Sequence, residues 1–230
     1  MRNYIYYDAT YFIYMLPALA ISLFAQMRVN SAFRKYRLVR MSSGATGQQA
    51  ATRILLANGL ESVRIEGASG LLSDHYDPAK RILRLSPEVM QGASVASVAI
   101  AAHECGHALQ HQQNYAFLRL RSALVAYAGI GNMASYFLIL AGILFSASGL
   151  VLAGIVFFSV FVLFQLITLP VELNASARAK AELDRLGMAA ADEMQGVSSM
   201  LSAAALTYVA ATITALLQLL RLLSLFRRRD

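Results

Sequence analysis

The sequence predicts a mainly α-helical fold in which several helices cross a membrane and a smaller α+β part lies in the cytoplasm. Of the 230 residues, 57% are hydrophobic and only 14% are charged, whereas ordinary soluble domains carry about 25% charged residues. Apolar stretches long enough to span a bilayer recur along the chain. One polar stretch, from about residue 42 to 120, separates the first of them from the rest.

The excess of basic over acidic residues, a formal net charge of +7, is interpreted as a topology signal. Positive residues accumulate on the cytoplasmic side of membrane proteins. The basic stretches are not interleaved with aromatic residues in the way that a nucleic-acid surface requires. We therefore expect a lipid bilayer as a partner and no nucleic acid, while the oligomeric state stays open.

Residues 1–28 are predicted to form an N-terminal transmembrane anchor. The apolar stretch 11–27 is just long enough to span a bilayer. The tyrosines at its start are typical of an interfacial aromatic belt: Tyr4, Tyr6, Tyr7 and Tyr11. Five basic residues come after the stretch, which places this end of the helix in the cytoplasm and the N-terminus outside. They are Arg28, Arg34, Lys35, Arg37 and Arg40.

Residues 29–120 form the predicted cytoplasmic α+β part. The segment 46–58 has the apolar spacing of a helix and ends at an Asn-Gly stop signal. Short strands are expected at 62–66 and 81–86, with a turn around Asp77 between them. We therefore predict a small antiparallel hairpin just ahead of the next helix.

That next helix carries the strongest functional signal of the chain, an HExxH string of sequence His-Glu-Cys-Gly-His. The run 93–102 before it is rich in helix formers. Residues four apart lie on one face of a helix, so His103 and His107 can reach one metal ion. Glu104 lies beside that face, where it can contact a metal-bound water. Cys105, the only cysteine, points away from His103 and is interpreted as a packing residue.

Residues 121–170 are predicted to form a transmembrane helical hairpin. Its two apolar stretches, 123–146 and 149–169, are joined by a short connection of small residues around Ser146. Two spans return the chain to the side that it left. The residues after the hairpin are therefore expected to lie in the cytoplasm with the HExxH helix.

Residues 171–197 are predicted to form a cytoplasmic helix that begins near Pro170. Residues 198–230 form a C-terminal membrane helix, whose apolar stretch 199–226 ends in three arginines, 227–229. If this helix spans, its arginines emerge outside, against the positive-inside rule. The sequence leaves two possibilities open: the helix spans, or it lies in the membrane plane or packs on the catalytic part.

Catalytic zinc sites usually have three protein ligands, so a third is needed. Glu172 is the favoured candidate because it lies at the membrane border in the first turn of the predicted helix, where the macrodipole also favours a carboxylate; the other interpretation is a helix-start glutamate. His111 lies about 12 Å along the helix from His103, too far for a shared ion, and is interpreted as exposed. The other acidic residues are interpreted as solvated surface: Glu182, Asp184, Asp192 and Glu193.

Five segments, found in order along the chain, together resemble the YugP-like bacterial membrane zinc metallopeptidases. The resemblance extends over nearly the whole chain, from Tyr6 to the last apolar helix, and is far more specific than an HExxH string alone. The segments are 46–55, 73–78, 103–107, 169–176 and 201–211.

The resemblance implies a multi-pass peptidase of the bacterial cytoplasmic membrane, with a zincin-like part and with Zn²⁺ held by His103, His107 and a downstream glutamate. The Glu-x-x-Ala-Ser pattern at Glu172 is similar to the Glu-x-x-Ala-Asp third-ligand motif of HtpX-type membrane peptidases, which favours Glu172 as the ligand. Ser176 stands in place of that aspartate, so Asn174 or Ser176 itself is expected to orient a ligand histidine.

The predicted function is therefore that of a membrane-embedded zinc metalloendopeptidase acting on protein or peptide substrates, with its active site facing the cytoplasm. Glu104 takes the proton of the zinc-bound water and hands it to the leaving amine. The oxyanion needs a further donor, and His75, Arg178 and Tyr208 are the candidates in the family-like part of the chain.

The alternative is a zinc-binding membrane scaffold or assembly factor without catalysis. Metal binding alone does not require Glu104, so its presence favours hydrolysis. A transporter is disfavoured because transporters carry ionisable residues inside the membrane, and the segment 123–169 has only Asn132 and Gln165 as amide side chains.

Overall fold

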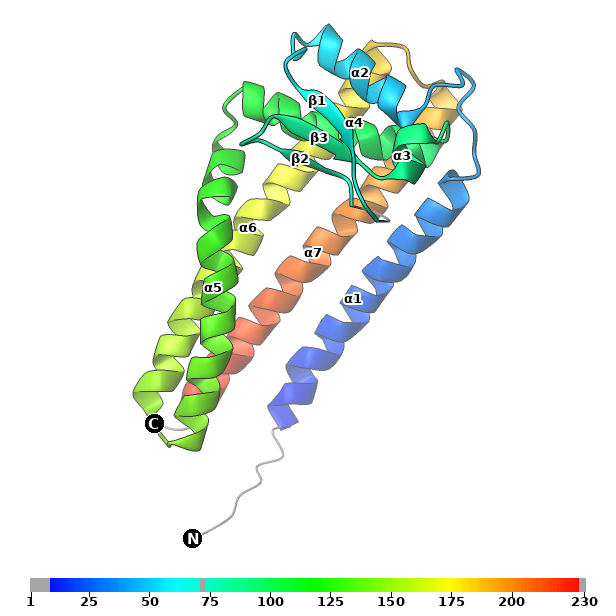
Figure 1. The fold of residues 1–230 in the computed structure, drawn as a ribbon. Helices are drawn as coiled ribbons and strands as arrows, with labels where there is room; N and C mark the ends of the chain where they lie inside the picture. Colours follow the sequence, from blue (N-terminus) through cyan, green and yellow to red (C-terminus); the bar gives the residue numbers. More distant parts are fainter. Residues whose placement is uncertain (1–8, 71–72, 228–230) are drawn as a thin grey trace.

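The computed structural model describes residues 9–70 and 73–227 and shows the mainly helical fold that the composition predicts (Figure 1). A small three-stranded sheet lies among short helices at one end of a set of long helices. The helices are α1 (Ala9–Tyr36), α2 (Gly47–Ala57), α3 (Pro87–Gln91), α4 (Val95–Gln112), α5 (Ala116–Leu144), α6 (Ser148–Arg185) and α7 (Ala191–Arg227), and the strands are β1 (Arg64–Gly67), β2 (His75–Asp77) and β3 (Ile82–Leu85).

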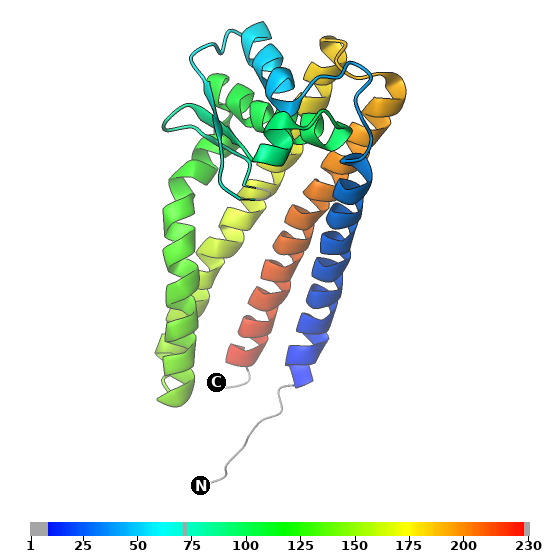
Figure 2. The same cartoon turned by 45° about the vertical axis from the view of Figure 1, so that its right-hand side comes forward.

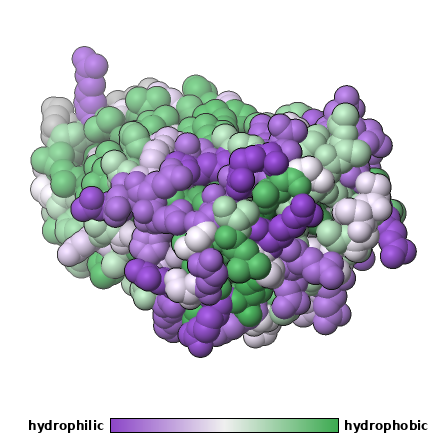
Figure 3. Space-filling model, turned by 90° about the horizontal axis from the view of Figure 1, so that it is seen from above, coloured by the Kyte–Doolittle hydropathy of each residue, from purple (hydrophilic) through white to green (hydrophobic). Residues whose placement is uncertain are grey.

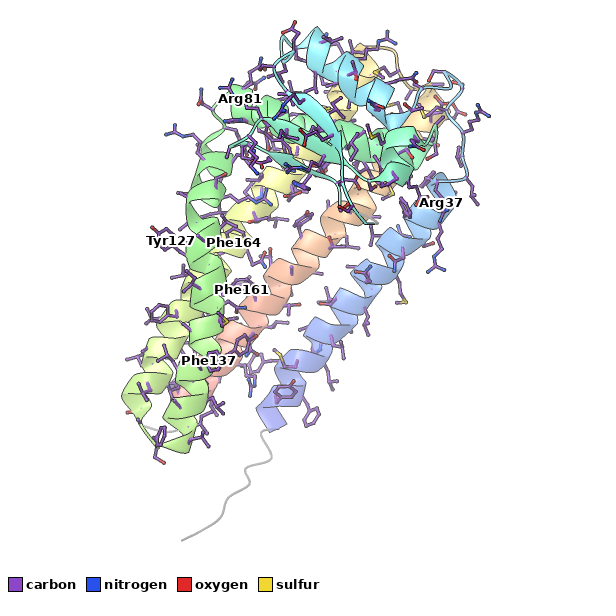
Figure 4. All side chains as sticks on the ribbon, in the orientation of Figure 1. Arg37, Arg81, Tyr127, Phe137, Phe161 and Phe164 are labelled. Atoms are coloured by element: carbon purple, nitrogen blue, oxygen red, sulfur yellow. The ribbon has the colours of Figure 1, made fainter. Side chains whose placement is uncertain are left out.

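Four helices, α1, α5, α6 and α7, are long and apolar enough to cross a membrane. Large apolar side chains cover their outer faces. Tyr127 and Phe137, which Figure 4 labels on α5, are each 68% exposed. An apolar surface of this extent is what a helix presents to lipid. Seen from the end that carries the sheet, by contrast, the surface is largely hydrophilic, with hydrophobic residues gathered along one side (Figure 3).

In their described parts, the long helices are arranged in a row. Helix α5 packs against α6, α6 against α7, and α7 against α1. Figures 1 and 2 show α1 and α5 as the two outer members of this row. Side-chain hydrogen bonds between described residues join α1 to α7, among them Tyr14 Oη to Ser224 Oγ at 3.2 Å and Ser22 Oγ to Thr214 Oγ1 at 3.1 Å. The row is open rather than closed into a ring.

The last helix runs antiparallel to α1 along its length and ends where α1 begins (Figures 1 and 2). Of the two possibilities that the sequence left open, its path matches a helix that spans. Arg227 is its last described residue, whereas Arg228 and Arg229 lie outside the described residues, as do Tyr4, Tyr6 and Tyr7 of the predicted aromatic belt.

The prediction of a separate helix beginning near Pro170 is wrong. One continuous helix, α6, runs from Ser148 to Arg185 with Pro170 inside it. A proline removes only one backbone donor, and a membrane helix packed against neighbours tolerates that loss. Glu172 therefore lies in the middle of a helix, so the macrodipole argument for it does not apply. The boundary predicted between residues 170 and 171 lies inside the continuous helix α6.

The predicted strand pairing also needs correction. The strands expected at 62–66 and 81–86 are β1 and β3, and they pair in parallel, with Arg64 opposite Ile82. The antiparallel partner of β3 is the short strand β2, so the sheet order is β1-β3-β2. The Asp77 carboxylate accepts hydrogen bonds from the backbone N–H of Ala79 and Lys80, and this tight turn allows β2 and β3 to form the hairpin.

The HExxH helix α4 lies at the centre of the α+β part and packs against α2, α6 and α7. Its N-terminus is capped by Ser94, whose hydroxyl accepts from the backbone N–H of Ser97. Most of its side chains are buried, and many are alanines, which let neighbouring helices approach closely. The core of this end of the molecule therefore holds α4 rigidly against the membrane helix α6.

Candidate metal centre

Three side chains that can bind a metal converge between α4 and α6. His103 and His107 come from α4 and Glu172 from α6, and one ligand atom of each lies within 4.8 Å of the others. Glu172 Oε2 is 3.2 Å from His103 Nε2 and 3.7 Å from His107 Nε2. Ligands at about 2.0–2.2 Å from a tetrahedral zinc lie about 3.4 Å apart. The donor set and its spacing therefore fit zinc.

The centre is shielded from water on the side of α6 and open on the side of His103. Glu172 is 1% exposed, His107 and Glu104 are each 8% exposed, and His103 is only partly buried. Burial alone lowers the pKa of His107, but hydrogen bonding to Glu172 and the charges of Glu104 and Glu172 outweigh it and raise that pKa. The electrostatic field at the triad therefore favours a positive charge, as a metal site requires.

Each histidine is oriented by a hydrogen bond at its other ring nitrogen. Ser176 Oγ lies 3.1 Å from His103 Nδ1, and Gln110 Oε1 lies 3.0 Å from His107 Nδ1. With Nδ1 protonated, both rings donate to these oxygens and direct Nε2 toward Glu172. Ser176 thus occupies the orienting position that its place in the sequence suggested.

Gln110 was not predicted from the sequence, although it lies one helical turn beyond His107. Its side chain is fully buried, and its Nε2 donates to Val171 O at 2.8 Å and to Asn174 Oδ1 at 2.9 Å. Asn174 therefore acts on His107 through Gln110. The signal available in the sequence was the i, i+3 spacing of a histidine and an amide on the same helix face.

A glycine permits α4 to cross α6 closely at the metal centre. A Cβ added to Gly106, within the HExxH string, would lie 2.4 Å from Ala175 O. Cys105 next to it points the other way, toward Ala51 O of α2, and is fully buried. Burial raises the pKa of the Cys105 thiol, so it stays protonated as a packing residue. Glycine at 106 is what brings Glu172 within reach of both histidines.

Comparison with known proteins agrees with this geometry. A family model described as "Putative neutral zinc metallopeptidase" matches residues 11–227. The chain belongs to this metallopeptidase family. It is also 46% identical over 211 residues to "Putative membrane protease YugP" of Bacillus subtilis (strain 168), an alignment that covers 92% of this chain and 94% of that protein. No solved structure matches the chain. The resemblance found in the sequence is confirmed.

Of the three candidate oxyanion donors in this chain, the structure brings only Tyr208 near the triad. Its phenol, on α7, is partly buried, and the charges of Glu172 and Glu104 both act on it. His75 is exposed on β2, where its nitrogens contact Ser73 O and Arg84. Among the described residues, Arg178 bonds to Asn174 Oδ1 and Gln113 Oε1 rather than to a metal ligand.

Arg121 is a second residue at the centre that was not predicted from the sequence. Its Nη1 lies 3.4 Å from Glu172 Oε1, on the carboxylate oxygen that faces away from the histidines. A carboxylate shared between an arginine and a metal keeps its ionised form, because both partners are positive. Only the packing of α5 on α6 brings the two residues together, so no local pattern revealed the contact.

The other residues considered as ligands lie elsewhere. His111 is partly buried rather than exposed, and its Nδ1 lies 2.9 Å from Tyr76 Oη. The interpretation of Glu193 as solvated surface is wrong: it is buried and accepts hydrogen bonds from the backbone N–H of Ser42 and Ala190. Glu193 caps the start of α7, where unpaired backbone donors need an acceptor.

Gly106→Ala is expected to remove bound zinc and to destabilise the protein by about 1–3 kcal/mol, the usual cost of overpacking. The added methyl group forces α4 and α6 apart at the point where they share the metal. Zinc content and thermal unfolding in detergent measure both effects. Gly129→Ala, on α5, is the matched control, since its Cβ would meet no atom within 4 Å. Full zinc content in Gly106→Ala would refute the close crossing.

Ser176→Ala is expected to weaken zinc binding about 10-fold to 100-fold, the usual effect of removing an orienting partner from a ligand histidine. The fold should be retained, because only the hydroxyl is lost. Competition with a chelator of known affinity measures the change. Ser159→Ala on the same helix is the control, since among the described residues the Ser159 hydroxyl bonds only to Ile155 O of its own helix. Unchanged affinity in Ser176→Ala would show that His103 needs no orienting bond.

Proposed function

We propose that this protein is a zinc-dependent metalloendopeptidase of the bacterial cytoplasmic membrane, which hydrolyses peptide bonds in membrane-associated or unfolded proteins. The observation that carries the proposal is Glu104, a buried carboxylate that follows His103 in the chain and whose charge acts on His107 of the His-His-Glu triad. A site that only stores or carries a metal has no use for such a base.

His103, His107 and Glu172 would hold the zinc, and the fourth position would stay open for water. A zinc ion bound there would lower the pKa of that water and polarise the scissile carbonyl. Glu104 accepts the proton as the water attacks and then delivers it to the leaving amine. Gln110, Ser176 and the other orienting groups keep the two imidazoles in place while this happens.

Tyr208 is the donor that we assign to the developing oxyanion. The charges of Glu172 and Glu104 both act on its hydroxyl, which comes from a third helix, α7. A donor placed in advance stabilises the charge that appears on the carbonyl oxygen in the transition state. Arg121 is interpreted as a positioning residue, because it contacts the outer oxygen of Glu172.

Tyr208→Phe is expected to lower kcat about 100-fold to 1,000-fold, the range seen when one oxyanion donor is removed. KM and zinc content should change little, because the ring and its packing are retained. Steady-state hydrolysis of a quenched peptide and the zinc content are both measured. Together they distinguish a role of Tyr208 in stabilising the oxyanion from a role in metal binding. A variant that loses zinc and keeps kcat per bound metal would assign Tyr208 to metal binding.

The proposed orientation places the metal centre on the cytoplasmic side. The basic residues at the end of α1, among them Arg37, lie at the same end of the molecule as the sheet, where Figure 4 also labels Arg81. This agrees with the tendency of lysine and arginine to stay in the cytoplasm. Labelling of single added cysteines in intact cells tests the orientation, and Cys105, being fully buried, gives little background.

A further inference from the structure

A cavity of about 740 Å³ lies among the four long helices, in the part of the protein that is apolar enough to cross a membrane. Side chains from all four helices line it, including Met15 of α1, Ile139 of α5, Phe161 of α6 and Thr214 of α7. Phe161 is labelled in Figure 4. Because the helices form an open row, the cavity lies between the outer helices α1 and α5 and can be entered from the bilayer.

Two residues that line this cavity each carry a buried amide oxygen with no hydrogen-bond partner among the described residues. Asn132 Oδ1 on α5 and Gln218 Oε1 on α7 are both buried, and both residues line the cavity. Asn132 lies twelve residues before the end of α5 and Gln218 nine before the end of α7. Along the helix axis, Asn132 is therefore about 18 Å from the end of α5, and Gln218 is about 13 Å from the end of α7. With the helix ends placed at the membrane surface, both amides lie near the middle of the bilayer core, where an unpaired polar atom is costly.

Two of the helices that line the cavity, α6 and α7, also carry residues at or near the metal centre. Gln165 lines the cavity and lies seven residues before Glu172 on α6, a distance of two turns or about 10 Å. Ala211 lines it three residues after Tyr208 on α7. A segment lying along the cavity in the direction of the helices would therefore direct its cytoplasmic end toward the metal centre.

We infer that this cavity is the docking site for a membrane-spanning segment of the polypeptide substrate, with a polar side chain near its middle. Calling the occupant a substrate rests on the proposed peptidase function. The two unpaired amide oxygens need donors at mid-bilayer depth. Lipid acyl chains have none, whereas an Asn, Gln, Ser or Thr on a transmembrane helix supplies one. The docked helix closes the open side of the row and presents the residues beyond its cytoplasmic end to the metal centre.

Disulfide cross-linking to a synthetic transmembrane helix tests the inference without requiring catalysis. The probe is a leucine-alanine helix with lysine ends, a central asparagine and one cysteine at the matching depth, in phosphatidylcholine vesicles. Ile139→Cys faces the cavity, while Phe137→Cys lies two residues away on the lipid-facing side of α5. We expect at least about fivefold more cross-linking at position 139. Equal cross-linking at both positions, or none at 139 because phospholipid fills the cavity, would overturn the inference.

The asparagine of the probe gives a second, independent readout. Replacing it with leucine, or introducing Asn132→Leu into the Ile139→Cys protein, is expected to reduce cross-linking about threefold to tenfold. Zinc content serves as the check that Asn132→Leu is folded. If the yield of cross-linking were unchanged by both substitutions, the proposed role of the amides would be refuted. Cross-linking to the helix without any peptide hydrolysis would refute the peptidase function alone. Cleavage of casein without cross-linking to the helix would refute the docking site alone.

Discussion

Glu104→Gln is expected to lower kcat for peptide hydrolysis by a factor of about 10² to 10⁴ while the protein keeps its zinc. The substitution preserves the size of a side chain that is 8% exposed and removes its ability to accept a proton. The triad of His103, His107 and Glu172 is left unchanged. Hydrolysis of casein or a quenched peptide and metal content, both measured on purified protein in detergent, report on the two properties separately.

This variant also separates a peptidase from a metal-binding scaffold. A scaffold or assembly factor uses the zinc only for structure. Its function and zinc content should therefore not change when a base that does not bind the metal is lost. Glu88→Gln is a suitable control, because Glu88 forms an ion pair with Arg37 away from the triad. If Glu104→Gln hydrolysed peptides as fast as the unmodified protein, the assigned mechanism would be wrong.

Glu172→Ala is expected to weaken zinc binding by more than about a hundredfold, a larger effect than the loss of an orienting partner. Two histidines cannot complete the three-ligand set of a catalytic zinc. The substitution also leaves Arg121 without the carboxylate at 3.4 Å that balances its charge, so some loss of stability should accompany the loss of metal. Zinc titration in the presence of a competing chelator, together with thermal unfolding, measures both.

Asp184→Ala is the matched control, since Asp184 is an exposed carboxylate on the same helix. It should bind zinc as the unmodified protein does. Glu172→Gln adds a second comparison, because it keeps the shape of the side chain and a neutral oxygen. Normal zinc affinity in both Glu172 variants would mean that the third ligand is another residue.

Local spacing was sufficient to predict the part of the site that lies on one helix. The four-residue interval of His103 and His107 and the neighbouring Glu104 depend only on helix geometry. Glu172 was found by counting membrane spans, and its contact with the histidines depends on α6 crossing α4 at Gly106. Arg121 was assigned no role at the site because its contact arises only when α5 packs on α6.

The errors in the fold have a common origin. The sequence pattern predicts a helix start at Pro170, but packing around a membrane helix outweighs the single lost hydrogen bond, so α6 continues through it. The strands at 62–66 and 81–86 were recognised as strands, yet their pairing depends on the path of the intervening chain, which forms β2 and reverses direction at Asp77. Pairing and helix continuity are tertiary properties that local sequence patterns do not determine.

Metal dependence tests the central claim most directly. Purified protein in detergent would be assayed for zinc content and for peptide cleavage, then stripped with a chelator and reloaded with zinc. We expect about one zinc per chain, loss of cleavage on stripping and recovery on reloading. A properly folded protein that binds no zinc at the His103, His107 and Glu172 triad would contradict the proposed function.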